Sequence, residues 1–300
     1  MSPAAPLPLK VQLGARTLVT LRPRLVRVPL ALDDVREGRV PRMPRLDPGG
    51  AGYLVTSLPE ALLQDTVRAT SGMIAFVRQR YTRYHADLRG GFDAYHATLS
   101  ANTRQGLKRK AKKLGTLDVR RYREPHEMEA FHRIARGIAL TTYQERLMGA
   151  GLPDDAAFVA RMLADAASGH ARGWLLFIDG VPAAYLFCPI RTGVAIYEYV
   201  GHDPHFSALS PGAVLQLEAM RDLAEDPGVT AFDFTEGEGQ HKRAMATGGT
   251  ACVDVLLLRR TLANRAMVAG LRGFDGAVAL AKRAVARAGL QDLAKRIRRG

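Results

Sequence analysis

Cysteine, long apolar runs and acidic residues are all scarce in this 300-residue sequence. Its two cysteines, Cys188 and Cys252, exclude a disulfide scaffold and a cysteine-based zinc site. No apolar run reaches the roughly 18 residues that a membrane-spanning helix needs, and residues 1–10 lack the basic stretch and apolar block of a signal peptide. We therefore expect a cytoplasmic protein in a reducing compartment, without a metal ion.

The shortage of acids leaves a strong positive charge. Lysine and arginine number 43 against 29 acids, which gives a net charge of +14. The excess is local: residues 259–300 hold eleven basic and two acidic residues, and residues 104–113 hold six basic residues and no acid. This charge indicates partners that carry phosphates, namely nucleic acid, anionic lipid or a phosphorylated cofactor. Nucleic acid is the weaker candidate, because residues 259–300 hold a single aromatic side chain for base stacking.

The remaining composition, with 47% apolar residues, is that of a folded protein with one large or two modest domains. Over the first part we expect one or two strands at 18–32 and a turn at 47–50. A helix is expected over 60–77, because a proline stands at its first turn, and a strand over 78–88. Apolar residues three and four apart predict a helix over 92–114, with one break near Asn102.

Residues 116–258 show a denser succession of elements. Asp179-Gly180 is a strong hairpin signal, and Ser210-Pro211 is a helix start, because serine caps well and proline suits the first turn. The expected order is β-α-α-β-β-β-α-β-α-β. Its strands are 116–123, 174–178, 183–189, 194–200, 230–235 and 252–259, and its helices are 125–140, 153–167, 211–223 and 237–247.

Two local motifs accompany this order. Residues 231–243 are similar to the "fDFgrGdepYKr" stretch of CelD-like acetyltransferases, with His241 where those proteins usually have tyrosine. Residues 100–109, with Ser100, Arg104 and Leu107-Lys108-Arg109, are similar to the "S..R..lrr" helix that precedes the same core. Together with the element order, they make residues 80–258 resemble the GNAT acyltransferases of the CelD-like and FemAB-like types.

The resemblance implies a mixed α/β (α+β) fold, with a GNAT-like splayed mixed sheet flanked by helices. Three parts are expected: residues 1–115, which could be a degenerate GNAT-like half, the acyltransferase core at 116–258, and a basic amphipathic helical tail at 259–300. In that fold acyl-CoA lies between two central strands, and the next helix presents its free amides to the pyrophosphate. The residues implied for the cofactor contacts are Val200, Ser210, Gly212, Arg104 and Lys242.

N-acyl transfer needs a base for the amine proton and a donor to the developing oxyanion. Glu198 lies in an otherwise apolar strand, which should raise its pKa and suit a general base; facing solvent or pairing with an arginine is the alternative. For Asp233 we favour a structural role, in which its carboxylate binds backbone amides at the end of a strand, over a catalytic role. Loop acids, an imidazole and phenols are further catalytic candidates, each with an ordinary structural role as its alternative: Glu236, Glu238, His241, Tyr197 and Tyr199.

We therefore expect an acyl-CoA-dependent N-acyltransferase in which a primary amine attacks the thioester directly, since neither cysteine stands beside a base. The acceptor stays open between an amino sugar or other envelope amine and a long-chain lipid amine such as a sphingoid base. The basic tail suggests an anionic membrane surface as partner, at the inner face of the membrane, with packing on the domain as the alternative. Two rival functions remain: a FemAB-like transferase that uses aminoacyl-tRNA, and a non-catalytic GNAT-fold membrane or interaction module.

Overall fold

The computed structural model describes residues 4–13, 16–142, 151–237 and 239–287, and the chain divides into two compact units. Unit 1 is Met1–Arg80 together with Ala251–Gly300, and unit 2 is Tyr81–Thr250. Both boundaries fall inside strands, β6 (Met73–Asp87) and β13 (Gly248–Arg259). By sequence, unit 2 is therefore an insertion in unit 1, and each unit is described by itself.

Unit 1 contains a sheet in the order β1-β4-β5-β13-β6 and a separate hairpin of β2 and β3. Strand β4 runs parallel to β5, and β13 runs antiparallel to β5 on its other side. The elements are the strands β1 (Ala5–Pro6), β2 (Leu9–Leu13), β3 (Arg16–Leu21), β4 (Arg24–Pro29) and β5 (Gly52–Pro59), and the helices α1 (Leu32–Arg36), η1 (Glu60–Leu62), α2 (Leu63–Ala69) and α10 (Leu262–Arg287).

The helix expected over 60–77 is wrong beyond residue 69. Helix α2 ends at Ala69, and Gly72, with φ of 91°, adopts a backbone conformation that favours glycine. Strand β6 then begins at Met73, where β-branched and aromatic residues follow. Sheet pairing therefore outweighs the helical periodicity of this stretch.

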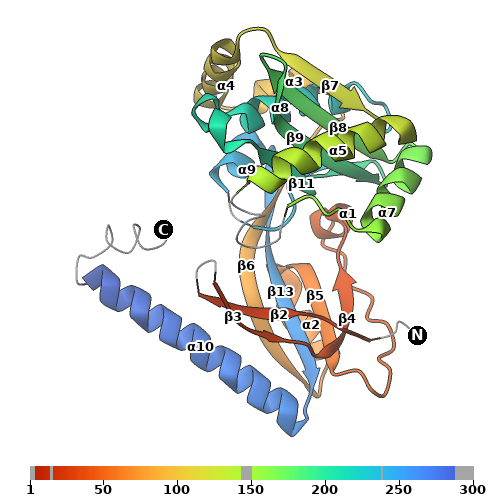
Figure 1. Ribbon diagram of the computed structural model, residues 1–300. Helices are drawn as coiled ribbons and strands as arrows, with labels where there is room; N and C mark the ends of the chain where they lie inside the picture. Colours follow the sequence, from red (N-terminus) through yellow and green to blue (C-terminus); the bar gives the residue numbers. More distant parts are fainter. Residues whose placement is uncertain (1–3, 14–15, 143–150, 238, 288–300) are drawn as a thin grey trace. The chain divides into compact units, whose positions relative to one another are not determined.

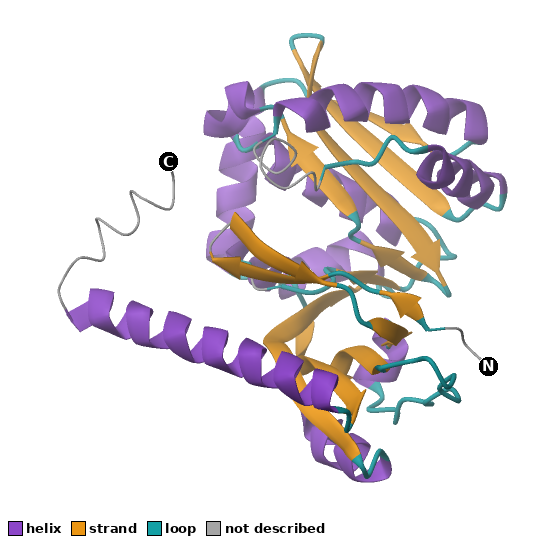
Figure 2. Ribbon diagram, turned by 60° about the horizontal axis from the view of Figure 1, so that its bottom comes forward, coloured by secondary structure: helices purple, strands orange, loops and turns teal. Residues whose placement is uncertain are grey.

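Helix α10 packs its first turns against the sheet of unit 1. Val268 and Leu271 are buried in a cluster with Leu256 and Leu258 of β13 and Phe76 of β6. The described part of the expected helical tail is one helix of 26 residues, the long purple helix of Figure 2. None of the described helices combines the length and apolar character needed to cross a bilayer.

Unit 2 contains a mixed sheet in the order β6-β12-β10-β9-β8-β7, with β11 paired to β9. Strands β10 and β12 are parallel, and the neighbouring pairs are antiparallel. Asp179 and Gly180 form the expected hairpin turn, both with positive φ. The strands are β7 (Asp118–Tyr122), β8 (Ala171–Ile178), β9 (Val181–Arg191), β10 (Val194–Ile196), β11 (Tyr199–His202) and β12 (Ala231–Asp233).

Helices cover both faces of this sheet (Figure 1). Trp174 and Leu176 of β8 are buried with α3, α4 and α8, whereas Leu175 and Phe177 are buried with α5 and α7. Because alternate residues of a strand point to opposite faces, each group of helices covers one face, and the expected fold class is confirmed. The helices are α3 (Gly91–Thr98), α4 (Ala101–Leu114), α5 (Pro125–Thr141), α7 (Ala156–Ala167), η2 (Pro204–Leu209), α8 (Pro211–Ala224) and α9 (Gln240–Met245).

The division into units differs from the expected boundary at residue 115. Helices α3 and α4 both contact α8, and Tyr95 and Leu107 are buried in the same cluster as Leu215, so residues 81–115 belong to unit 2. The break expected near Asn102 lies just before α4, where the hydroxyl of Ser100 accepts a hydrogen bond from the Thr103 amide at 3.1 Å.

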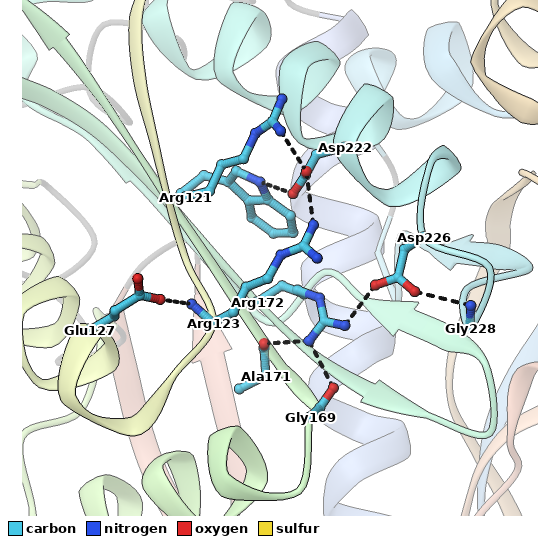
Figure 3. Close-up of polar contacts among 10 residues, drawn as sticks. Arg121, Arg123, Glu127, Gly169, Ala171, Arg172, Asp222, Asp226 and Gly228 are labelled. Atoms are coloured by element: carbon cyan, nitrogen blue, oxygen red, sulfur yellow. Dashed lines mark hydrogen bonds and ion pairs between the residues drawn. The ribbon is translucent and has the colours of Figure 1, made fainter.

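A buried carboxylate fixes the C-terminal part of α8 to the sheet (Figure 3). Asp222 accepts a hydrogen bond from Trp174 Nε1 at 2.9 Å and one from Arg123 at 2.9 Å, and Arg121 lies 3.1 Å away. Trp174 belongs to β8 and Arg121 to β7. Two strands therefore hold this end of the helix in position.

A second carboxylate, Asp226, follows the end of α8 (Figure 3). It accepts hydrogen bonds from Arg172 of β8 at 2.6 Å and from the Gly228 amide at 3.0 Å. Burial opposes its ionisation, but these hydrogen bonds outweigh burial and hold the pKa of the carboxyl below its ordinary value. The turn after α8 is thus tied to the sheet as well.

Candidate active site

The central strands of unit 2 separate after a short parallel pairing. Strands β10 and β12 are paired along their whole length, and one more bond runs from the Tyr197 amide to the Asp233 carbonyl at 2.9 Å. Beyond it, β11 pairs with β9 alone among the described strands. The other edge of β11 is therefore left open, and an extended ligand can hydrogen-bond to main chain there.

The continuous strand expected over 194–200 is wrong, because an irregularity divides it into β10 and β11. The register against β9 shifts by one residue between the two strands, as in a β-bulge. Tyr197 packs on the α8 side against Phe232, whereas Tyr199 packs on the α7 side against Phe158. Residues two apart in a regular strand share a face, so the bulge turns the two phenols in opposite directions.

Glu198 stands in this bulge, beside the open edge of β11. Its side chain keeps contact with solvent, yet desolvation by the surrounding protein raises the pKa of its carboxyl, against the opposing effect of Arg161 and Arg191. Arg191 is shared, because it also binds Asp165 at 2.7 Å. A carboxyl with a raised pKa and access to water is suited to accept a proton.

Asp233 occupies the end of β12 as a buried ion pair. Its carboxylate accepts hydrogen bonds from Arg83 Nε at 3.2 Å and from the Arg83 terminal nitrogen at 2.5 Å, and a third from the Thr235 amide at 2.8 Å. Thr235 has a positive φ of 60°. These contacts match the favoured expectation that Asp233 holds the chain where it leaves the strand.

The segment after β12, which leads into α9, brings His241 near Tyr197. The ring of His241 lies 6.2 Å from the Tyr197 ring, and Lys242 Nζ donates a hydrogen bond to the Glu236 carbonyl at 2.6 Å. Desolvation, and then the charge of Lys242, lower the pKa of His241, so the imidazole is neutral at neutral pH. The Glu236 carboxylate is exposed, and Glu238 lies outside the described residues.

The start of α8 presents an open main chain. Ser210 adopts a left-handed conformation with φ of 56° and joins η2 to the helix. Its side chain makes no cap, contrary to expectation, and Pro211 takes the first helical position. Apart from its chain neighbours and the backbone of its own helix, no atom of the described residues lies within 4 Å of where a Cβ on Gly212 would stand. Because first-turn amides lack partners within a helix, a phosphate can approach them here.

Helix α4, which carries six basic residues, contacts both η2 and α8. Lys108, Arg109 and Lys112 line a shallow hollow of about 560 Å³ on α4. Arg104 is used differently: its guanidinium donates hydrogen bonds to the carbonyls of Ala97 and Leu99, at the end of α3. Lys108, Arg109 and Lys112 thus lie together at one hollow, where an anionic ligand can meet all three.

The structure thus places the expected residues in two sets around the point where β11 and β12 separate, which we call the splay. Glu198 and Tyr199 lie on the α7 side. His241 lies with Tyr197 beyond the end of β12. Val200 of β11 is half-buried and pairs with Leu186 of β9. Three arginines are not identified from the sequence: Arg83, which pairs with Asp233, and Arg161 and Arg191, whose charges lower the pKa of Glu198.

His202, Asp203 and His205, which stand close together in the sequence, lie where β11 ends and η2 begins. The Asp203 carboxylate accepts a hydrogen bond from the His205 amide at 2.9 Å, and His202 contacts Ser207. Across the described ranges, no group of three histidine, cysteine or acidic side chains is placed to hold a metal ion. These residues shape the entry into η2.

Comparison with known proteins covers the same region. Residues 101–243 match the family described as "Acetyltransferase (GNAT) domain". The C-terminal domain of a putative lysylphosphatidylglycerol synthetase from Agrobacterium fabrum superposes with a TM-score of 0.51 and 14% identity, over 73% of this chain and 71% of that chain. A conserved protein of unknown function from Bacteroides thetaiotaomicron gives 0.50 and 12%, over 70% of both chains. FemX gives 0.48 and 11%, over 70% and 72%. No curated protein matches by sequence.

Proposed function

We propose that this acyltransferase takes its acyl group from a coenzyme A thioester and transfers it to a primary amine. The match of residues 101–243 to the GNAT acetyltransferase family supports the transfer chemistry. The splay between β11 and β12 is the observation that carries this proposal. Among the described strands, β11 pairs only with β9, and its other edge is without a strand partner close to Glu198.

The residues around the splay fit such a donor. Coenzyme A supplies the acyl group in activated form, as a thioester. The open main chain at Ser210 and Gly212 suits its pyrophosphate, and the hollow of Lys108, Arg109 and Lys112 suits a further phosphate. Lys242 is a further cation at the end of β12.

Each chemical task then has a residue. Glu198 takes the proton from the attacking amine, because its raised pKa matches it to that transfer. The main chain of β11, at Val200, donates to the oxyanion that develops on the thioester. Burial raises the pKa of Tyr197 well above its ordinary value, so this phenol stays protonated and donates a hydrogen bond to the departing thiolate, with His241 beside it.

The acceptor is an amino sugar or envelope amine, as in CelD-like proteins, or a lipid amine. Glu236 is exposed at the loop and can bind the ammonium group of either, and Tyr199 borders the α7 side. A lipid amine is the first to test, because one solved relative is named as a putative lysylphosphatidylglycerol synthetase and α10 is basic and amphipathic.

A second candidate donor is aminoacyl-tRNA. The helix α4 carries six basic residues and no acid, and such a run can follow a nucleic-acid backbone as well as bind coenzyme A. Binding of tRNA should weaken more steeply with salt than binding of coenzyme A, because tRNA makes the longer backbone contact and releases more counterions.

Calorimetric titration separates these donors. Purified protein is titrated with acetyl-CoA, palmitoyl-CoA, free CoA, charged tRNA and uncharged tRNA at two salt concentrations. We expect saturable binding of an acyl-CoA, with preference for one chain length, and weaker binding by the variant in which Lys108, Arg109 and Lys112 are glutamine.

The opposite result is equally clear. A folded sample that binds none of the three CoA species contradicts the donor proposal. Binding that requires the aminoacyl group and falls steeply with salt assigns the donor to tRNA. If Glu198→Gln leaves transfer unchanged with every acceptor tried, the splay is not the reacting centre and a non-catalytic module is favoured.

A further inference from the structure

Unit 1 contains a hollow that the acyltransferase chemistry does not use. It measures about 450 Å³ and lies between the start of β6 and helix α10. Its walls combine apolar side chains with guanidinium groups: Met73, Ile74, Val268, Arg260, Arg265 and Arg272. A concave apolar surface edged by cations is the form expected of a site for an amphiphilic anion.

The three arginines of this hollow have no anionic partner in the part of the chain that the structure describes. Elsewhere arginines meet acids, as Arg172 meets Asp226 at 2.6 Å. The side chains of Arg260, Arg265 and Arg272 are exposed and lie around one hollow with no carboxylate lining it. Like charges gathered at one point repel, so an external anion is favoured there.

Helix α10 extends this pattern along its length. Arg265, Arg272 and Arg283 are seven and eleven residues apart, which places them close to one line on a helix of 3.6 residues per turn. Asp275 is the helix's single acid. The arginine line borders the face opposite to the one that Val268 and Leu271 bury.

That outer face also carries exposed leucines. Leu262 is 84% exposed and Leu280 is 66% exposed. They are about five turns apart, so they point the same way and are separated by about 27 Å along the helix. Two exposed leucines beside a line of arginines are typical of a helix that lies in a bilayer interface, with its guanidinium groups at the headgroups.

We propose that unit 1 binds the surface of an anionic lipid bilayer through α10, and that Arg260, Arg265 and Arg272 hold the phosphate of one lipid headgroup. The apolar floor of Met73, Ile74 and Val268 contacts the adjoining lipid. A soluble phosphate would use the arginines but gain nothing from this floor or from Leu262 and Leu280. The inference does not depend on the identity of the acyl donor.

Vesicle flotation tests this assignment. The full chain is mixed with vesicles of phosphatidylcholine alone or of equimolar phosphatidylglycerol and phosphatidylcholine. We expect binding to the mixed vesicles only. The variant with Arg260, Arg265 and Arg272 changed to glutamine should partition on the order of a hundredfold less, because each basic residue near an anionic surface contributes about a fivefold factor.

Two further variants make the result specific. The variant with Lys108, Arg109 and Lys112 changed to glutamine loses the same charge from α4 and should float like the native chain. Leu262→Gln with Leu280→Gln keeps every charge and should also weaken flotation. Circular dichroism checks that each variant is folded.

We call the variant of Arg260, Arg265 and Arg272 the α10 variant, and the variant of Lys108, Arg109 and Lys112 the α4 variant. Three outcomes overturn the proposal: equal binding to both kinds of vesicle, an α10 variant that floats like the native chain, or an α4 variant that loses as much binding as the α10 variant. Release of the protein from vesicles by inorganic phosphate at the ionic strength of a chloride control would assign the hollow to a soluble anion instead. Retained transfer to a water-soluble amine by the α10 variant keeps this test separate from that of the acyltransferase.

Discussion

Glu198 is the residue whose surroundings matter most. It sits where the chain must bulge, so its side chain is set by the backbone irregularity rather than by strand alternation. Desolvation raises the pKa of its carboxyl, and Arg161 and Arg191 oppose that shift. The group is therefore a stronger proton acceptor than an ordinary glutamate.

Glu198→Gln should lower kcat by on the order of a hundredfold, the usual share of a general base. Native activity should rise with pH through an apparent pKa above that of an ordinary glutamate, and the variant's profile should lose that rise. A raised folded-state pKa means that stability falls as pH rises through it, so the variant should also melt slightly higher at neutral pH. Steady-state kinetics and thermal scans across pH measure both effects.

The exposed Glu129 of α5 provides the matched control. Glu129→Gln removes the same charge far from any residue of the splay in sequence and should keep native kcat and pH profile. A Glu198→Gln enzyme that keeps both kcat and the native pH profile would contradict the assignment of the base.

Among the elements, α8 has two different ends. Its N-terminus is open at Ser210 and Gly212, and its C-terminal part is tied to the sheet through Asp222. A helix that presents free amides to a ligand needs its axis held by other contacts, because no cap does so at the ligand end. Asp222 supplies that hold with a buried carboxylate.

Asp222→Asn keeps the shape of the side chain but removes its charge. Arg121 and Arg123 are about half exposed, so solvent compensates part of the loss, and the free energy of unfolding should fall by about 2 kcal/mol. Urea denaturation measures this change. Glu225→Gln, exposed at the same end of the helix, should change it little; equal losses in both variants would show that Asp222 is no anchor.

The sequence predicts those elements that local signals define. Asp179-Gly180 marks the hairpin and Ser210-Pro211 marks the start of α8, and both are where we expect them. The bulge at Glu198 has no local signal, because it arises from simultaneous pairing with β9 and β12. Glu198 itself could be named from its apolar surroundings in the strand.

Contacts between residues far apart in the sequence cannot be predicted from local signals. Asp233 and Arg83 are 150 residues apart, so nothing near Asp233 in the sequence identifies its partner. The start of β6 is missed for a related reason, because its helical periodicity is outweighed by pairing in a sheet whose other strands lie far away in the sequence. Arg161 and Asp165, four residues apart on α7, do leave a local signal, since they share a helix face.

At the scale of the whole molecule, two separate groups of cations stand out. One group of three cations lies on α4 in unit 2, and the other lies at α10 in unit 1. Since they share no residues, we expect them to bind different anions, the phosphates of the donor and those of a lipid surface.

The two glutamine triple variants should therefore have opposite defects. The α4 variant should bind acyl-CoA less tightly, with a raised KM for the donor, and float normally with anionic vesicles. The α10 variant should show the reverse. Measuring donor affinity and flotation for both variants gives a two-by-two comparison, and a variant that loses both activities would show that the cations act as one pool.

The position of β13 has a consequence for how the protein is made. In unit 1 this strand lies between β5 and β6 in the sheet, yet it follows both by the whole length of unit 2. A ribosome releases residues 81–250 before it has made the strand that completes the unit 1 sheet. Unit 2 is continuous and can fold during synthesis, whereas β5 and β6 must wait with unpaired edges until β13 emerges.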